Sequence, residues 1–123
     1  MHDWLVGLGH DLRKYITITA LKGVITGVMM LLTAGNLAQV AVWALLFRLL
    51  GEFPQFGDAF YHSAVNFATL GYGDIVMSTR HRLLGPLEAI NGALMIGAST
   101  ATLIVAFQNS MQKTLQSQQA TRT

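Results

Sequence analysis

The chain has 123 residues, of which 52% are hydrophobic and only 11% are charged, and its formal net charge is +2. Because a soluble domain usually contains about 25% charged residues, this composition argues against an ordinary soluble protein. The small positive charge is too scattered to indicate nucleic-acid binding, and the lack of cysteine excludes disulfides and cysteine-ligated metals.

The first element that the pattern predicts is an N-terminal amphipathic helix over residues 1–20. Charged residues and histidines take much of one side, and apolar residues recur at helical spacing on the other. Trp4 and Tyr15 on the apolar face, with basic residues nearby, suit a helix that lies in the membrane interface. The alternative is a polar start with little order, because Gly7 and Gly9 weaken helix propensity. The apolar set is Met1, Trp4, Leu5, Leu8, Leu12, Tyr15 and Ile16.

A first membrane span is predicted over residues 21–50. Charged residues are absent from Gly23 to Phe47, a gap longer than the ~20 apolar residues that a helix needs to cross a bilayer. Lys22 and Arg48 lie near opposite ends, where long side chains reach the headgroups. A break near Gly35 would leave two pieces too short to cross comfortably. The other alternative is a buried helix of a soluble protein, but a domain of 123 residues has no room for two buried helices this long.

A short helix is predicted over residues 58–68. The segment before it, residues 51–57, holds glycine, proline and a charge, which is typical of a loop, and Asp58 is a suitable N-cap residue. Eleven helical residues extend ~16 Å, about half the ~30 Å hydrocarbon thickness. We therefore expect a re-entrant pore helix that enters the membrane and returns, followed by the hexapeptide of residues 69–74.

A second span is predicted over residues 83–108, followed by a polar cytoplasmic tail over residues 109–123. No charged residue occurs from Ala89 to Gln112, and Pro86 suits the first turn of the helix. Glu88 is an acid at risk of burial, and we expect it to pair with Arg48 or Arg82; a role in tuning the segment of residues 69–74 is the alternative. The neighbouring residues Arg80, His81 and Arg82 are expected to be solvated in the loop.

The distribution of basic residues predicts the orientation. The two tails hold five of them and the segment that connects the spans holds three. Basic residues favour the cytoplasmic side, so both termini are expected to be cytoplasmic in a multi-pass protein of the cell (inner) membrane. The tail residues are Arg13, Lys14, Lys22, Lys113 and Arg122, and those of the connection are Arg48, Arg80 and Arg82.

The hexapeptide Thr69-Leu70-Gly71-Tyr72-Gly73-Asp74 suggests the chemistry. Irregular backbone at membrane depth is tolerated only where it is buried in protein or lines a watery path. Gly71 and Gly73 can adopt backbone conformations closed to other residues, which lets successive carbonyls point to one side. Four copies would surround an axis with rings of carbonyl oxygens that replace the hydration shell of a bare cation.

With this motif the sequence resembles the two-transmembrane pore-module potassium channel family, over about Leu21 to Gln108. The resemblance implies a prokaryotic ion channel with a TLGYGD filter. It also implies K⁺ coordination by the backbone oxygens of Thr69, Leu70, Gly71 and Tyr72, with the Thr69 hydroxyl, and it includes Gly73 in the filter. K⁺ is then the transported ion, and no other cofactor is expected.

The residues around this motif depart from the family pattern. Some members carry a pore-helix glutamate that holds the aspartate after the filter, but Val65 stands there, so Asp74 must find another partner or face water. The aromatic cuff around the filter tyrosine is Tyr61 plus His62. We expect Tyr61, His62 and Asp74 to support the filter. For His62 two alternatives stay open: it donates to a neighbouring Tyr72, or it is simply packed in place.

In the second span, Gly92 and Gly97 align with positions where family members bend the inner helix. Small residues that permit close helix packing are the alternative explanation for both. One helical face is assigned to the cavity and the inner mouth, with Ile104 or Gln108 as the narrowest point; a lipid or helix contact face is the alternative. This face comprises Gly97, Thr100, Ala101, Ile104 and Gln108.

The expected fold is therefore an all-α membrane protein, with two transmembrane helices, a re-entrant pore helix and a selectivity filter. It assembles as a homotetramer in the lipid bilayer. The expected function is passive potassium-selective conduction. A weakly selective cation pore and a non-conducting membrane anchor are the alternatives. An enzyme is not expected, because no nucleophile with a base, paired carboxylates or metal-spaced ligands occur.

Overall fold

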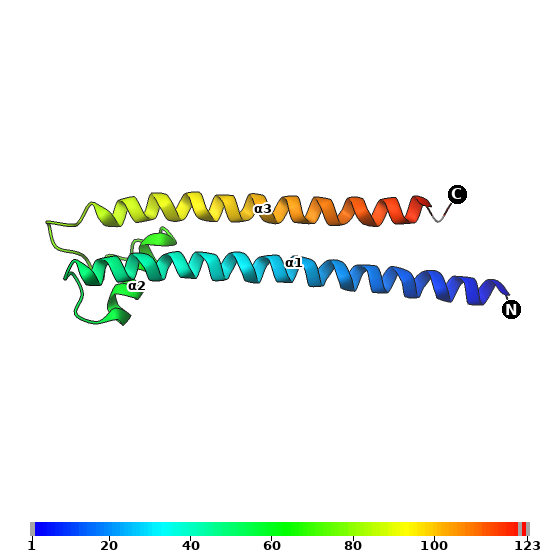
Figure 1. The fold of residues 1–123 in the computed structure, drawn as a ribbon, viewed down its shortest axis with the longest axis horizontal. Coiled ribbons are helices and arrows are strands. Elements are labelled where there is room, and N and C mark those ends of the chain that lie inside the picture. Colours follow the sequence, from blue (N-terminus) through cyan, green and yellow to red (C-terminus); the bar gives the residue numbers. More distant parts are fainter. Residues whose placement is uncertain (1, 121, 123) are drawn as a thin grey trace. The chain divides into compact units, whose positions relative to one another are not determined.

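The fold consists of three helices, α1 (His2–Leu49), α2 (Phe56–Phe67) and α3 (Leu84–Ala120), in a computed structural model (Figure 1). The structure describes residues 2–120 and residue 122. No strand occurs in this part of the chain. The prediction of an all-α protein with a short helix between two long ones is confirmed.

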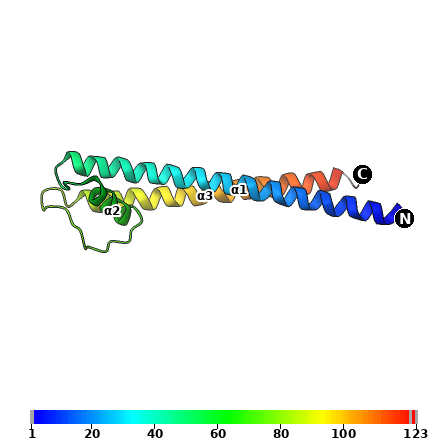
Figure 2. The ribbon, with the colours of Figure 1, turned by 90° about the horizontal axis from the view of Figure 1, so that it is seen from below.

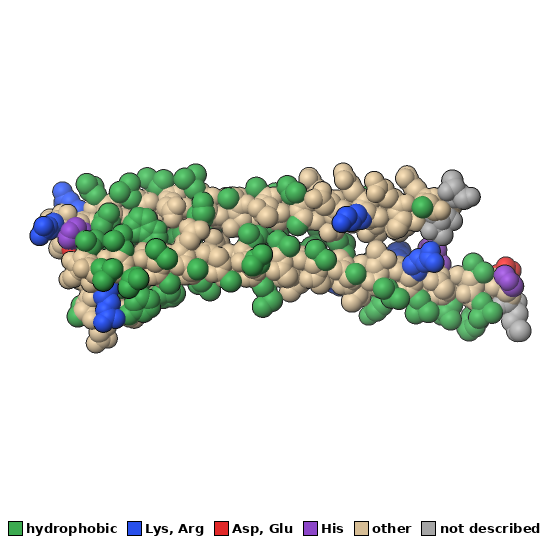
Figure 3. Space-filling view, viewed as in Figure 1, with side chains coloured by type: hydrophobic (Ala, Val, Ile, Leu, Met, Phe, Trp, Pro, Cys, Tyr) green, Lys and Arg blue, Asp and Glu red, His purple; other side chains and the backbone are tan. Residues whose placement is uncertain are grey.

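Two of the helices have the properties of membrane spans. In α1 and in α3, an apolar window of 18 residues is long enough to cross a bilayer, yet only 0% and 6% of the two windows are buried. The core helix of a soluble protein would be mostly buried. Figure 3 shows hydrophobic side chains over the visible face of both helices. Apolar surface on this scale needs lipid or another subunit to cover it.

The first long helix has no boundary at residue 20. α1 continues without interruption from His2 to Leu49, a length of ~72 Å at 1.5 Å per residue. It therefore extends well beyond the ~30 Å hydrocarbon core. Since no turn separates residues 1–20 from the span, their place in the membrane interface stays a prediction.

By their internal contacts the described residues form two compact units. One comprises residues 1–31 with 101–123, which are the first part of α1 and the last part of α3. The other comprises residues 32–100 and holds the remainder of both long helices, α2 and the connecting loops. The hexapeptide and the residues around it all belong to this second unit.

The end of α1 is determined by Gly51. The Gly51 amide donates to the Arg48 carbonyl at 3.0 Å, and the Glu52 amide donates to the Phe47 carbonyl at 3.1 Å. This pair of bonds is the Schellman motif, which requires a residue with positive φ between them. Gly51 has φ 78° and adopts it without steric cost. The motif turns the chain away from the helix axis and starts the loop that the sequence predicted.

The short helix begins two residues earlier than predicted. Gln55 is its N-cap, without a side-chain capping bond, and Asp58 lies in the first turn. The assignment of Asp58 as N-cap was therefore wrong, although its charge still complements the positive end of the helix dipole. The apolar side of α2 packs on the end of α1. The core there comprises Ala44, Phe47, Phe53 and Ala59.

Gly92 sets the distance between α2 and α3. A Cβ atom at this position would lie 2.0 Å from the Phe67 carbonyl oxygen, at the end of α2. No real Cβ contact is so short, so only glycine fits. Figures 1 and 2 both show α2 beside the two long helices. At Gly92 the structure supports close packing, the alternative to a hinge, and α3 is continuous there.

Candidate functional site

The hexapeptide begins in the turn that ends α2. The Thr69 amide donates to the Asn66 carbonyl at 2.8 Å, and the Leu70 amide donates to the Val65 carbonyl at 2.9 Å. These are again the two bonds of a Schellman motif, with Thr69 in the position that Gly51 occupies after α1. Thr69 has φ 60°, the single positive φ of a non-glycine residue in the described chain. A side chain in this conformation costs about 1–2 kcal/mol, and such strain concentrates at functional sites.

Positive φ values alternate along the hexapeptide. They occur at Thr69 (60°), Gly71 (59°) and Gly73 (73°), whereas Leu70 and Tyr72 between them are not in this region. In an extended strand, successive carbonyls point to opposite sides. Reversing the sign of φ at every second residue removes that alternation. The backbone is thus suited to gather several carbonyl oxygens on one side.

The hexapeptide lies open within a single chain. Leu70 is 55% exposed and Tyr72 is 65% exposed. Large apolar side chains at this exposure, in a segment between two membrane spans, indicate a surface that other chains cover. No group of three or more His, Cys, Asp or Glu side chains able to hold a metal occurs among the described residues.

Asp74 has a hydrogen-bond partner that the sequence did not identify. The Tyr61 hydroxyl on α2 donates to an Asp74 carboxylate oxygen at 2.7 Å. This bond stabilises the charged form and holds the pKa of Asp74 below its ordinary value. A tyrosine therefore takes over the part expected from a pore-helix glutamate, and it ties the end of the hexapeptide to α2.

Both ring nitrogens of His62 are engaged within the chain. Nδ1 donates to the Ile75 carbonyl at 2.8 Å, and Nε2 accepts from the Asn66 side-chain amide at 2.9 Å, because a carbonyl can only accept. The ring also packs against Phe47 and Phe53, with centroid distances of 5.6 and 5.0 Å. No donor is left for a neighbouring tyrosine. The structure thus favours the packed alternative, in which His62 anchors the segment just after Asp74.

Glu88 joins all three helices. Its carboxyl group forms a hydrogen bond with the Ser63 hydroxyl of α2, and the same hydroxyl donates to the Val40 carbonyl of α1 at 2.8 Å. Glu88 is fully buried. The expected pair with Arg48 or Arg82 was wrong. α3 passes close enough to α2 at this level for the Glu88 carboxyl group to reach the Ser63 hydroxyl.

A family described as "Ion channel" matches residues 36–109, which is more than half of the chain. The chain belongs to this ion channel family. The channel is thus a membrane protein that transports ions, not an enzyme. A comparison with curated proteins found no match, and neither did a comparison with solved structures.

A second acid, Glu52, ties together the loops on either side of α2. The Glu52 carboxylate accepts from the Ser78 amide at 2.7 Å, from the Ser78 hydroxyl at 2.6 Å and from His81 Nδ1 at 2.5 Å. These donors, Ser78 first, lower the pKa of Glu52 from 4.5 to about 2. The expectation that His81 is simply solvated was therefore wrong. The contact links the loop after α1 to the turn before α3.

The face of α3 assigned to the cavity is exposed in the channel subunit. Gly97 and Thr100 in one unit, and Ile104 and Gln108 in the other, are all exposed. The Thr100 hydroxyl donates to the Ile96 carbonyl at 2.9 Å, so its polarity is satisfied within the helix. The argument that Thr100 would be costly in lipid is therefore weaker than the sequence suggested. No atom would lie within 4 Å of a Cβ at Gly97.

Polar pairs link the two long helices within residues 32–100. Asn36 donates to Ser99 at 3.3 Å, and Asn91 donates to Gln39 at 3.4 Å. In a bilayer, side-chain hydrogen bonds of this kind help to hold helices together. They use the side of α3 that carries Asn91 and Ser99, and they leave the face of Gly97 and Thr100 free for other contacts.

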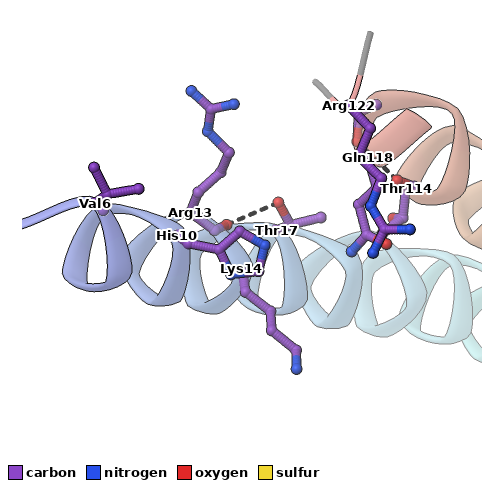
Figure 4. Close-up of a pocket in the computed structure, with 10 residues that line it drawn as sticks. Val6, His10, Arg13, Lys14, Thr17, Thr114, Gln118 and Arg122 are labelled. Carbon is purple, nitrogen blue, oxygen red and sulfur yellow. Dashed lines mark hydrogen bonds between the residues drawn. The ribbon is translucent and has the colours of Figure 1, made fainter. Parts of the chain in front are cut away.

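The other unit contains a pocket of about 690 Å³. Basic side chains of α1 and Arg122 are among the residues that line it. Figure 4 shows the side chains of Arg13 and Lys14 pointing in different directions. The charges therefore do not converge on one point. The lining residues are Val6, Gly9, His10, Arg13, Lys14, Thr17, Thr114, Ser117, Gln118 and Arg122.

Sequence reasoning missed the contacts of Glu52, Ser63 and Asn66. For Glu88 the sequence contains one indication of burial, because this acid lies next to a long stretch without charge. For Glu52 the sequence contains no indication of its contacts, because a single glutamate in a polar loop is ordinary. Each of these side chains acquires its partner from a segment more than 20 residues away, except Asn66, which bonds within α2.

Proposed function

We propose that the protein is a potassium-selective channel, in which residues 69–73 of four identical subunits form the selectivity filter. The observation that carries this proposal is the alternating positive φ at Thr69, Gly71 and Gly73, in a segment at the end of a short helix between two spans. Such a backbone can turn successive carbonyl oxygens toward one axis. Rings of carbonyls replace the hydration shell of K⁺ and permit rapid passage.

The K⁺ ions would be coordinated by the carbonyl oxygens of Thr69, Leu70, Gly71 and Tyr72, with the Thr69 hydroxyl. The bonds of Tyr61 to Asp74 and of His62 to the Ile75 carbonyl support the filter from α2. They lie at its outer end, where the strained backbone would otherwise relax. Potassium is the ion transported, and no further cofactor enters the proposal.

A homotetramer is part of the proposal, because one filter strand supplies only a quarter of an ion cage. Two spans also cannot enclose a path alone. The exposed side chains of Leu70 and Tyr72 would then be covered by neighbouring subunits. In the cell (inner) membrane, both termini would be cytoplasmic, in keeping with the basic residues of the tails.

The gate is proposed at the inner mouth. Gly97, Thr100 and Ala101 would line the cavity, and Ile104 and Gln108 would narrow it below. A ring of Ile104 side chains could block ions by excluding water. Replacing Ile104 by Asn should then raise the open probability in single-channel recordings, with no change in the potassium-to-sodium ratio. A change in selectivity alone would mean that this face is misassigned.

The decisive experiment is ion flux into liposomes that contain only this protein. Potassium flux should greatly exceed sodium flux under equal gradients. Equal fluxes of both ions would favour the weakly selective cation pore instead. Absence of any flux from correctly inserted protein would favour a non-conducting membrane anchor. Protein-free liposomes serve as the control.

A further inference from the structure

The buried carboxyl group of Glu88 lacks a counter-charge. Glu88 is 0% exposed, and this burial exists within a single chain, without any neighbour. Among the residues that the structure describes, the one ion pair joins Glu52 to His81. The Oε2 atom of Glu88 has no hydrogen-bond partner in the described part of the chain. A buried carboxylate with no cation and one bare oxygen is far more costly than a buried neutral acid.

The hydrogen atoms around Ser63 point to the same conclusion. The Ser63 hydroxyl carries one proton but contacts both the Val40 carbonyl and the Glu88 carboxyl group. The Val40 carbonyl can only accept, so it takes the Ser63 proton. The bond between Ser63 and Glu88 then needs a second proton, and Glu88 is the group that can provide it.

We propose that Glu88 is an uncharged carboxylic acid that donates to Ser63 and thereby positions the pore helix. The chain of bonds runs from Glu88 on α3, through Ser63 on α2, to the Val40 carbonyl on α1. It holds α2 to both long helices. Thr69, the first filter residue, follows Ser63 by less than two helical turns. A displacement at Ser63 would therefore reach the filter directly.

The other ionisable side chain that α2 places in this region, His62, already has hydrogen-bond partners at both ring nitrogens. His62 uses one ring nitrogen for Ile75 and the other for Asn66. The Asn66 amide in turn lies beside the Glu88 carboxyl group. His62 therefore has no ring nitrogen left to bond Glu88. The effect of Glu88 on conduction rests on the proposed function, but the protonation of Glu88 does not.

Infrared spectroscopy of the intact protein in lipid tests the protonation directly. A neutral carboxylic acid has a C=O stretching band that a carboxylate lacks. At neutral pH the wild-type protein should show this band, and Glu88→Gln should remove it. The absence of the band from the wild type, or its persistence in Glu88→Gln, would overturn the assignment of an uncharged Glu88. This result does not depend on whether the protein conducts.

Potassium flux tests the positioning role, once the wild type has been shown to conduct. Glu88→Gln keeps the shape and a donor for Ser63, and it should conduct like the wild type. Glu88→Leu keeps the burial but loses the donor, and its flux should fall about tenfold, which corresponds to about 1.4 kcal/mol. Ser63→Ala removes the hydroxyl that Glu88 bonds, and the potassium flux of this variant should fall by a similar factor.

Cross-linking confirms that each variant assembles like the wild type before its flux is compared. Equal losses in Glu88→Gln and Glu88→Leu would show that charge is needed, and they would overturn the neutral acid. Unchanged flux in both Glu88→Leu and Ser63→Ala would overturn the positioning role. A wild type without flux would instead contradict the proposed function and leave the infrared result as it stands.

Discussion

Gly71 shows how one residue type permits the backbone of the hexapeptide. Its φ of 59° is open to glycine but costs other residues about 1–2 kcal/mol. Within the chain nothing lies within 4 Å of an added Cβ, so the cost is backbone strain and not a clash. In a tetramer of a variant with another residue at position 71, each of the four subunits would carry this strain, about 4–8 kcal/mol in all.

We therefore expect Gly71→Ala to abolish potassium flux in liposomes while the protein still inserts and assembles. Gly57→Ala is the matched control. It adds the same methyl group to α2, where φ is ordinary and nothing lies within 4 Å of the new atom. Flux at the wild-type level from Gly71→Ala would contradict the assignment of residues 69–73 as a filter.

Glu52 makes the stability of the loops on either side of α2 depend on pH. Because the folded protein lowers its pKa from 4.5 to about 2, the stabilisation from Glu52 is complete above pH 4.5 and is lost as the pH falls toward 2. Below that range the group is protonated in both folded and unfolded states, and its contribution vanishes.

The thermal unfolding temperature of the detergent-solubilised protein should fall across this pH range. In Glu52→Gln, which cannot ionise, the fall should be smaller, and the variant should be less stable than the wild type at neutral pH. Two curves of the same slope would show that the contacts of Glu52 with Ser78 and His81 do not contribute to stability.

At the level of helices, α2 depends on glycine in α3. A Cβ at Gly92 would lie 2.0 Å from the Phe67 carbonyl oxygen, whereas a Cβ at Gly97 would meet nothing within 4 Å. Gly92→Ala should therefore destabilise the protein by about 1–3 kcal/mol, the usual cost of overpacking. Gly97→Ala should be neutral or slightly stabilising, because alanine favours helices.

Chemical unfolding of both variants in detergent measures this difference. If Gly92→Ala is as stable as the wild type, the close approach of α3 to α2 is wrong. If Gly97→Ala alone loses flux while remaining stable, Gly97 serves the inner helix as a hinge, or it faces a neighbouring subunit.

The end of α2 combines two features that the sequence keeps separate. A Schellman motif normally places glycine at its left-handed position, as Gly51 does after α1. After α2 that position is Thr69, which accepts the strain of a β-branched residue and offers a hydroxyl group to the site. The end of α2 and the start of the hexapeptide are therefore the same structural feature.

For the molecule as a whole, the exposed apolar surface demands partners. Both long helices expose most of their apolar windows, and the hexapeptide exposes Leu70 and Tyr72. Lipid can cover the helices, but a filter strand needs other strands around the ion. We expect four subunits in native mass spectrometry or after cross-linking in detergent. A stable monomer or dimer that still conducts would contradict this.

Much of the fold follows from local features of the chain. The gaps without charge from Gly23 to Phe47 and from Ala89 to Gln112 predict two spans, because the cost of a charge in lipid acts on each residue separately. Glycines at alternate positions likewise predict an unusual backbone over residues 69–74, since φ is a property of single residues. These predictions required no knowledge of which segments meet.

The contacts of the candidate site could not be predicted in this way. Asp74 bonds Tyr61, Glu88 bonds Ser63, and Glu52 bonds Ser78, each across a distance in the sequence that only folding closes. A charged or polar side chain has many possible partners, and its choice depends on how closely the helices approach. Gly92 sets that approach for α3, so the burial of Glu88 and its contact with Ser63 are consequences of packing between helices.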